Sequence, residues 1–291
     1  MNINTSFHLL KSFVRAPISN SIHPTLKQNA ALLIEYGESL SNTIVYKSGL
    51  DVPLPDKSQV LIRVNNSSIN PLDNEMRKGY ARNIVNIKQN LPMILGRDCS
   101  GEIINVGSGV WDFRVGDLVW GATAPFSNGS HGEYVLLDES EISLKPKSLN
   151  HEQAASIPFA ALTAWNAIYN VANISSNSRV LVNGGNGGVG FMAINLLKKD
   201  IQCKEVVATC QPKNFEKLLK AGADRVIDYT LDYNQVKDFD IVLNCVDGGE
   251  TIQSKCLSTL RSSGGHYISF NGPIKFKMPT IIIKMVNQMA K

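Results

Sequence analysis

The feature that most constrains this chain is a glycine-rich run at residues 183–190, which reads Asn-Gly-Gly-Asn-Gly-Gly-Val-Gly. It follows the apolar stretch 179–182 and precedes residues 188–199, where apolar side chains recur at helical spacing. A strand, a glycine-rich turn and a helix in this order open a nucleotide-binding βαβ unit. The order therefore favours dinucleotide binding over the alternative, a glycine-rich turn that closes an ordinary α/β unit.

Three glycines, Gly185, Gly187 and Gly190, match the G-x-G-x-x-G pattern. In that pattern the first glycine permits the tight turn, the second lets the backbone approach a pyrophosphate, and the third lets the helix pack against the strand. The pyrophosphate lies at the helix N-terminus, because unpaired N–H groups and the helix dipole favour an anion there.

The next predicted strand, residues 206–210, indicates which dinucleotide is bound. NAD-binding chains place an Asp or Glu at the end of this strand, about 20 residues after the loop, to hold the ribose 2′-hydroxyl. Here Glu205 opens the strand and Glu216 falls in the next helix, whereas Lys213 follows the strand end. A lysine can pair with a 2′-phosphate that an acid would repel. The sequence thus predicts NADPH rather than NADH, with a solvated helix-start base as the alternative for Lys213.

Two parts of the chain have different patterns. Residues 30–165 hold short alternating runs, such as 60–64, 101–106 and 133–137, separated by turn residues, which is typical of an irregular and mostly antiparallel β domain. Residues 166–291 alternate strands with helices, which predicts an α/β domain with a doubly wound parallel sheet. The helices and strands expected there after 199 are 206–210, 214–221, 226–228, 240–246, 251–260 and 266–270.

Composition excludes several classes of protein. With 43% hydrophobic and 19% charged residues among 291, the chain can bury a sizeable core. Its five cysteines include no C-x-x-C pair, so neither a zinc knuckle nor a disulfide framework is encoded. No apolar run approaches the roughly 18 residues that cross a bilayer. The net charge of +4 owes much to the acid-free residues 1–34, so the body of the chain offers nothing that predicts nucleic-acid binding.

The first residues of the chain have the pattern of a targeting segment. Ile3, Phe7, Leu10 and Val14 recur at helical spacing, bases lie on another face, and serines and threonines are frequent up to residue 25. Residues 1–29 therefore resemble a mitochondrial transit peptide, which is excluded from the folded body. The alternative is a solvated tail of a cytosolic protein.

Six ordered motifs carry a resemblance to a family, which spans residues 30 to about 270. The chain resembles the zinc-independent quinone oxidoreductase branch of the medium-chain dehydrogenase/reductase superfamily. Segments 95–98, 145–149 and 222–229 are most similar to its mitochondrial reticulon-interacting subfamily. The six motifs are 69–73, 95–101, 113–121, 154–158, 161–165 and 187–190.

The resemblance implies a GroES-like domain at 30–165 and a Rossmann domain at 166–291, with the cofactor and a reducible substrate in a cleft between them. It also implies cofactor contacts. For Tyr229 the alternative is an aromatic that packs on the sheet edge, and for Thr163 it is a small helix residue near the domain junction. The implied contacts are Asn186, Gly188 and Val189 at the phosphates, Cys210 and Lys213 near the adenosine ribose, Tyr229 beside the 2′-phosphate and Thr163 at the nicotinamide.

The chemistry that the resemblance implies uses no metal. Zinc-dependent relatives supply His-Glu where this chain has Arg97-Asp98, and residues 100–202 contain no cysteine. The hydride acceptor must then be polarised already, as in a quinone or an α,β-unsaturated carbonyl. Asn70 and Asp73 are candidates to hydrogen-bond the acceptor or ribose, with a loop-capping Asn-Pro turn as the favoured alternative. Arg97 and Asp98 are expected to form an ion pair.

Relatives in this family continue beyond the point where this chain ends, with a sixth Rossmann strand and a return into the first domain. The C-terminal part is therefore expected to be truncated, and the apolar run 279–286 to be covered by a second copy or another partner. The expected function is NADPH-dependent reduction of a quinone or enone in the mitochondrial matrix, with a link to ubiquinone metabolism. The alternatives are a catalytically silent NADPH-binding or scaffold protein and a mitochondrial 2-enoyl thioester reductase.

Overall fold

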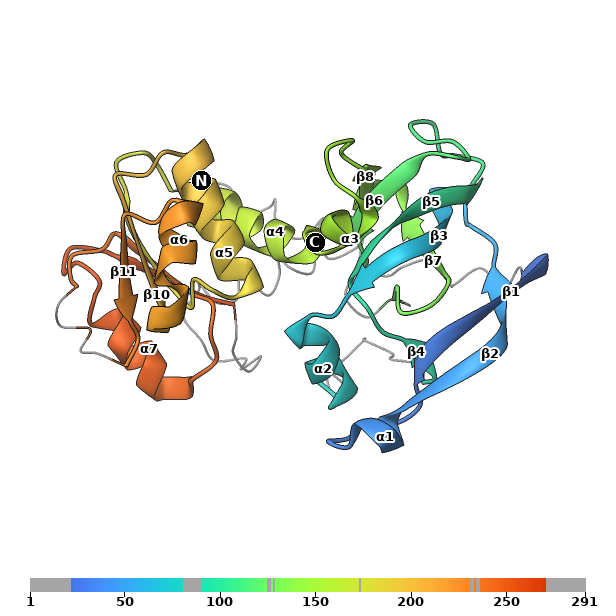
Figure 1. The fold of residues 1–291 in the computed structure, drawn as a ribbon, viewed down its shortest axis with the longest axis horizontal. Helices are drawn as coiled ribbons and strands as arrows, with labels where there is room; N and C mark the ends of the chain where they lie inside the picture. Colours follow the sequence, from blue (N-terminus) through green and yellow to red (C-terminus); the bar gives the residue numbers. More distant parts are fainter. Residues whose placement is uncertain are drawn as a thin grey trace, which may run out of the picture. The chain divides into compact units, whose positions relative to one another are not determined.

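The computed structural model describes residues 22–80, 91–124, 127, 129–172, 174–230, 233 and 236–270. These residues form two compact units that divide between Phe159 and Ala160, shortly before the boundary after residue 165 that the sequence predicts (Figure 1).

The first unit contains two antiparallel sheets. The smaller has the strand order β2-β1-β4, and the larger has the order β7-β3-β5-β6-β8. This is the irregular β domain that the sequence predicts, here with the two sheets of a GroES-like unit. Its strands are β1 (Ile22–Leu33), β2 (Ile44–Pro53), β3 (Gln59–Ser68), β4 (Met93–Ile94), β5 (Asp98–Val106), β6 (Leu118–Ala122), β7 (Tyr134–Asp138) and β8 (Ile142–Leu144). Its helices are α1 (Leu40–Thr43), α2 (Pro71–Arg77) and α3 (His151–Ala155).

Strand β1 begins inside the segment that the sequence assigns to a leader. Its backbone pairs with β2 from Ile22 opposite Pro53 to Leu33 opposite Ile44, and Lys27 forms an ion pair with Asp51. The folded body therefore starts before residue 30. The expected amphipathic helix near the N-terminus and the apolar run 279–286 lie outside the described residues.

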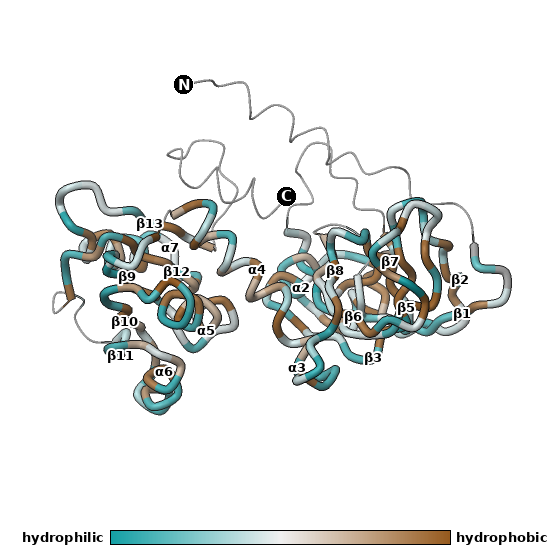
Figure 2. The backbone as a smooth tube through the Cα atoms, turned by 90° about the horizontal axis from the view of Figure 1, so that it is seen from above, coloured by the Kyte–Doolittle hydropathy of each residue, from teal (hydrophilic) through white to brown (hydrophobic). Residues whose placement is uncertain are grey.

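The core of the larger sheet comes from alternate positions on its strands. Val60 and Ile62 of β3 belong to this core, while Leu61 between them is buried but lies outside it, as expected when successive side chains point to opposite faces. Figure 2 shows hydrophobic residues along β5 and β7, which flank β3 in this sheet. The rest of this core is Cys99, Ile103, Val119, Val135, Leu137 and Ile142.

The second unit contains a five-stranded parallel sheet with the order β11-β10-β9-β12-β13. This is the doubly wound sheet that the sequence predicts, because the strand order reverses on either side of β9. Its strands are β9 (Arg179–Asn183), β10 (Glu205–Cys210), β11 (Arg225–Asp228), β12 (Ile241–Asn244) and β13 (His266–Ser269). Its helices are α4 (Pro158–Asn166), which starts just before the division, α5 (Gly188–Asn195), α6 (Phe215–Ala221) and α7 (Gly249–Leu257).

The parallel sheet is buried on both faces. Val180 and Val182 of β9 pack in the cluster that holds Ile194 of α5 and Leu218 of α6. Leu181, between the two valines, points the other way, into the cluster that holds Cys256 of α7. Figure 1 shows α5 and α6 side by side on one side of the sheet. Continuous apolar strands such as β9 are the pattern expected of a parallel sheet with helices on both faces.

None of the helices in the described part of the chain combines the length and the apolar character that crossing a membrane requires.

Candidate functional site

The glycine-rich run forms a tight turn between β9 and α5, and Gly184 makes it. Gly184 has φ +81°, and a Cβ there would lie 2.4 Å from Cγ1 of Val246. Only glycine adopts this conformation without strain, so the residue that permits the turn is Gly184. The sequence assigned that task to Gly185, which has no positive φ.

Gly185 and Gly190 are required for close packing. A Cβ at Gly185 would lie 3.0 Å from the side chains of Ala208, Ile194 and Leu218, between the sheet and two helices. A Cβ at Gly190 would lie 2.4 Å from the carbonyl oxygen of Gly184. The first turn of α5 thus lies directly against the glycine-rich turn, with no room for a side chain at Gly190.

Gly187 is different, because a Cβ there would meet only the Gly184 carbonyl oxygen, at 3.5 Å. Gly187 and Gly188 are both exposed. The first hydrogen bond of the helix runs from the N–H of Phe191 to the carbonyl of Gly187, at 2.9 Å, so the three N–H groups before it precede the helical ladder. Open space beside helix-start N–H groups is what a diphosphate needs, and the site fits that group.

Three of the predicted adenosine-side residues end neighbouring strands or follow them. Cys210 ends β10 opposite Asp228 of β11, and Gln211 Nε2 donates to Tyr229 Oη at 3.1 Å. Lys213 is exposed in the 3-10 turn Pro212–Asn214 that follows. Burial raises the pKa of the Cys210 thiol, so this residue is a neutral neighbour of the loop.

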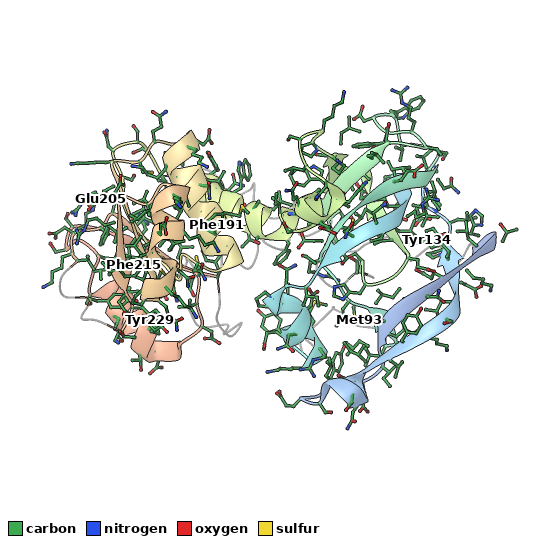
Figure 3. The ribbon with its side chains drawn as sticks, viewed as in Figure 1. Met93, Tyr134, Phe191, Glu205, Phe215 and Tyr229 are labelled. Carbon is green, nitrogen blue, oxygen red and sulfur yellow. The ribbon has the colours of Figure 1, made fainter. Side chains whose placement is uncertain are left out.

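Two acidic residues near β10, Glu205 and Asp228, bond to other groups of the chain. Glu205 begins the strand, lies at the opposite end of the second unit from Tyr229 in Figure 3, and bonds Arg179 Nε at 2.8 Å. Asp228 is an acid near the strand end that the sequence argument did not consider, because it belongs to β11. Its Oδ1 accepts from the N–H of Thr230 at 2.9 Å, so it caps its own turn.

Lys217 is a candidate that the sequence argument missed. Its Nζ donates to Oδ1 of Asn186 at 3.0 Å and lies 5.0 Å from the ring centre of Phe191. Lys213 and Lys217 also line one surface groove between α5 and α6, where Lys220 is already paired with Glu216. The signal was available, because Lys217 follows Lys213 by one helical turn on the next element.

Helix α4 approaches the glycine loop. A Cβ at Gly188 would lie 3.4 Å from the Cβ of Ala160, in the first turn of α4. Thr163 follows in the same helix and is buried. Val189 packs partly buried against the core cluster of the second unit, while Asn186 carries the bond to Lys217. Apart from Thr163, the predicted cofactor residues therefore lie in the glycine-rich run 183–190, at the end of β10, or just after β10 and β11.

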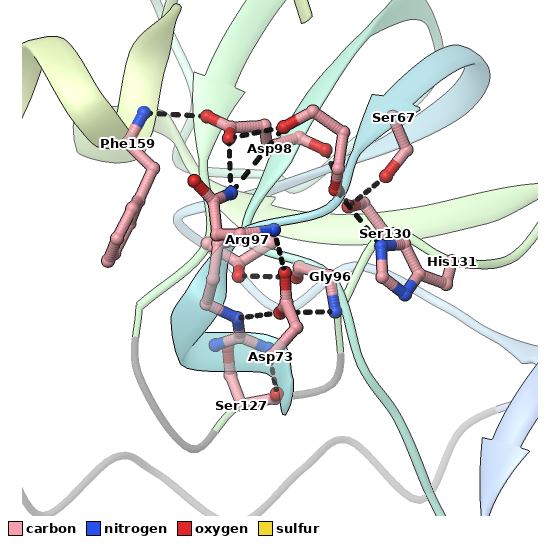
Figure 4. A network of polar contacts seen from close by, with 12 residues as sticks. Ser67, Asp73, Gly96, Arg97, Asp98, Ser127, Ser130, His131 and Phe159 are labelled. Carbon is pink, nitrogen blue, oxygen red and sulfur yellow. Dashed lines mark hydrogen bonds and ion pairs between the residues drawn. The ribbon is translucent and has the colours of Figure 1, made fainter. Parts of the chain in front are cut away.

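In the first unit, Asn70 and Asp73 are helix-capping residues. Asn70 precedes α2, and its N–H donates to Oδ2 of Asp73 at 2.7 Å. The buried Asp73 carboxylate also accepts from the N–H of Gly96, at 3.1 Å, and lies 3.6 Å from Nε of Arg97 (Figure 4). The ion pair expected between Arg97 and Asp98 is wrong, since Arg97 pairs with Asp73.

Asp98 is buried, and its carboxylate accepts hydrogen bonds from neutral donors. Oδ2 accepts from Asn70 Nδ2 at 2.6 Å and Ser68 Oγ at 2.7 Å, and Oδ1 accepts from the N–H of Phe159 at 2.6 Å (Figure 4). Burial raises the pKa of this carboxyl, although the donors oppose the rise. Asp98 thereby holds the start of α4 and the side chain of Asn70 in place.

Arg97 stands where zinc-dependent relatives have a metal-binding histidine. Its Nη1 donates to the carbonyl of Ala124 at 2.6 Å and its Nη2 to that of Ser127 at 3.2 Å. A guanidinium carries no lone pair for a metal, so this position contributes no ligand. Within the described residues, no group of three His, Cys, Asp or Glu side chains gathers in a way that could hold a metal ion.

Comparison with known families matches both parts of the chain. Residues 56–147 match the family described as "Alcohol dehydrogenase GroES-like domain", and residues 221–291 match "Zinc-binding dehydrogenase". The second description is a family title, and its match does not include residues 97–98.

Several named proteins are similar to the chain. "NAD(P)H oxidoreductase RTN4IP1, mitochondrial" from Dictyostelium discoideum is 54% identical, over 84% of this chain and 72% of that protein. "2-methylene-furan-3-one reductase" from Solanum lycopersicum is 32% identical, over 89% of this chain and 66% of that protein. The chain spans only 60% of the length of its RTN4IP1 relatives from Danio rerio and Mus musculus.

A solved structure agrees with these relatives. The quinone oxidoreductase from Coxiella burnetii is 32% identical with a TM-score of 0.72, and the match covers 91% of this chain and 80% of that one. The GroES-like and parallel sheets, the glycine loop and these matches lead to one conclusion: the chain belongs to the quinone oxidoreductase-like branch of the medium-chain dehydrogenase/reductase superfamily, whose relatives here include mitochondrial NAD(P)H oxidoreductases.

Proposed function

We propose that this chain binds NADPH and directs its hydride to a quinone or an α,β-unsaturated carbonyl, without a metal. The observation that carries the proposal is the open space at Gly187, beside the first N–H groups of α5. Two lysines nearby, Lys213 and Lys217, supply the positive charge that a 2′-phosphate requires. The names of the relatives support an NAD(P)H-dependent reductase.

The cofactor residues follow from this placement. The N–H groups of Gly188 and Val189 would receive the diphosphate, with Asn186 beside them. Cys210, Lys213 and Tyr229 would surround the adenosine ribose and its 2′-phosphate, and Thr163 would face the nicotinamide. Gly185 and Gly190 contribute by packing, which keeps the loop close to the sheet.

The chemistry that NADPH supplies when bound is a hydride from the nicotinamide ring. A conjugated acceptor takes that hydride at carbon or oxygen without a Lewis acid, because conjugation already polarises it. The task of the chain is to align donor and acceptor and to exclude water. Asp98 contributes by holding Asn70, and Asp73 by holding the start of α2, so both carboxylates act on the position of other groups.

The proposal includes a cellular location for this chain. The relatives from Dictyostelium, zebrafish and mouse are named as mitochondrial proteins. We place this chain in mitochondria, in the matrix, where a quinone acceptor connects it to ubiquinone metabolism. A fluorescent fusion carrying residues 1–29 should enter mitochondria, and a fusion lacking residues 1–21 should remain in the cytosol.

The test of the activity is NADPH oxidation followed at 340 nm with a panel of quinones and enones. We expect turnover with at least one conjugated acceptor, and the same rate with EDTA present. A rate lost on metal removal would contradict metal-free transfer. Saturable NADPH binding without turnover on any acceptor would indicate a silent binding protein. Turnover confined to a crotonyl thioester would indicate an enoyl thioester reductase.

A further inference from the structure

A buried cluster of neutral polar side chains lies directly beneath the glycine turn. It joins the C-terminal ends of β9, β10 and β12 to Tyr267 of β13, and it includes Tyr233 from the connection before β12. Its bonds are Thr209 Oγ1 to Asn183 Oδ1 at 2.6 Å, Tyr233 Oη to Asn183 Oδ1 at 2.7 Å, Asn183 Nδ2 to Asn244 Oδ1 at 2.8 Å and Asn244 Nδ2 to Tyr267 Oη at 2.9 Å.

Thr209 connects this cluster to the loop. Its hydroxyl oxygen accepts from the N–H of Gly184 at 3.0 Å, and its carbonyl accepts from the N–H of Gly185 at 2.9 Å. One residue of β10 therefore holds both N–H groups at the start of the turn, including that of the glycine with φ +81°. The N–H groups left for an anion are those that follow, at the start of α5.

The chemistry of the cluster suits a site for an anion. Asparagine and threonine side chains carry no charge, and burial raises the pKa of Tyr233 to about 12, so its hydroxyl stays neutral. The cluster can fix the loop through five hydrogen bonds without placing a negative charge below a diphosphate. Because the hydroxyl of Thr209 both accepts and donates, its bonds strengthen one another.

We infer that Thr209 is a positioning residue for the cofactor diphosphate, acting through Gly184, and that Tyr233 supports it through Asn183. This inference rests on the proposed NADPH site and adds the residues that set its geometry. Neither side chain touches the cofactor. Both determine where the loop presents the N–H groups of Gly188 and Val189.

The test compares substitutions that remove the same hydroxyl at two buried threonines. Thr209→Val removes the acceptor of the Gly184 N–H and keeps the side-chain shape. Thr259→Val is the matched control. Thr259 follows α7 and is also fully buried, and its hydroxyl donates to the carbonyl of Cys256. For each protein the Kd values for NADPH and for adenosine 2′-monophosphate are measured by calorimetry, together with Tm.

We expect Thr209→Val to weaken NADPH binding about tenfold, since a buried N–H loses its partner where the loop must be ordered. Adenosine 2′-monophosphate lacks the diphosphate, so its Kd should change less than about twofold. Thr209→Ser, which keeps the hydroxyl, should restore NADPH binding to within about threefold of the original. Thr259→Val should lower Tm by about as much as Thr209→Val does, while its NADPH Kd stays the same as that of the unsubstituted chain.

Other outcomes would overturn the inference. They are an unchanged NADPH Kd in Thr209→Val, or equal losses for NADPH and for adenosine 2′-monophosphate. If Thr209→Val does not fold, Tyr233→Phe decides instead, with about threefold weaker NADPH binding expected and an unchanged Kd counting against the role. Failure of the unsubstituted chain to bind NADPH would instead reject the proposed function itself.

Discussion

The Nε atom of Arg97 lies 3.6 Å from Oδ1 of Asp73, and both side chains are buried. This ion pair joins the segment before β5 to the first turn of α2. Arg97 also donates to two carbonyls of the segment around residues 124–127, so one guanidinium ties three parts of the first unit together. A position that offers a ligand in zinc-dependent relatives has thus become a structural cation here.

Replacing Arg97 should therefore be costly. Arg97→Met leaves the Asp73 carboxylate buried without its cation, which costs about 3–5 kcal/mol of unfolding free energy. Arg63→Met is the matched control, because the Arg63–Glu102 pair is largely exposed and should contribute less than about 1 kcal/mol. Urea unfolding measures both, and similar losses for the two variants would contradict a structural role specific to Arg97.

Substitutions at two glycines of the loop should affect different properties, one the free energy of unfolding and the other NADPH binding. Gly184→Ala forces a Cβ into φ +81° and against Val246, so it should cost about 1–3 kcal/mol of stability. Gly187→Ala places a methyl group in open space, so stability should change by less than about 1 kcal/mol, while NADPH binding weakens at least about tenfold. Unfolding curves and calorimetry test the pair, and unchanged NADPH binding in Gly187→Ala would show that no diphosphate approaches there.

The roles of these glycines show what the sequence could and could not predict. The strand before the loop and the helix after it follow from apolar spacing and were predicted closely. The G-x-G-x-x-G template begins at Gly185, so it offers no reason to assign the turn to Gly184. A positive φ depends on how the chain meets Val246 of another strand connection, which spacing alone does not reveal.

The two lysines near the loop should set the preference for the phosphorylated cofactor. Lys213→Met and Lys217→Met should each raise the NADPH Kd about fivefold, because each removes a charged donor from a phosphate, and leave the NADH Kd within about twofold. Lys220→Met is the control on the same helix, where Lys220 already pairs with Glu216, and it should change neither Kd. Equal loss for NADPH and NADH would place these lysines at the diphosphate instead.

A pH dependence is expected from His151, at the start of α3. Burial, with Lys145 nearby, lowers the pKa of His151 below its usual 6.5, and Nδ1 lies 2.8 Å from Ser100 Oγ. As pH falls below 7, the unfolded chain takes up this proton before the folded chain does, so stability decreases. Between pH 7 and pH 5, His151 should lower the Tm of the original chain by about 1–3 °C. The total fall in Tm over this pH range should be smaller in His151→Gln. An identical slope in both proteins would rule out this source.

Long-range pairs were the hardest part of the site to predict. Arg97 and Asp98 are adjacent in sequence, yet successive side chains of an extended chain point to opposite sides, so each finds its own partners. Asp73 lies in a different element, and only the folded chain brings it to Arg97. The spacing of Lys217 from Lys213 could have pointed to it, but its contact with Asn186 appears only when the glycine loop and α6 lie together.

The most direct test is calorimetric titration of the purified chain with NADPH and, separately, with NADH. The account predicts saturable binding at one site per chain, with NADPH bound at least about tenfold more tightly because Lys213 and Lys217 supply positive charge for the 2′-phosphate. No saturable NADPH binding, or tighter binding of NADH, would contradict it.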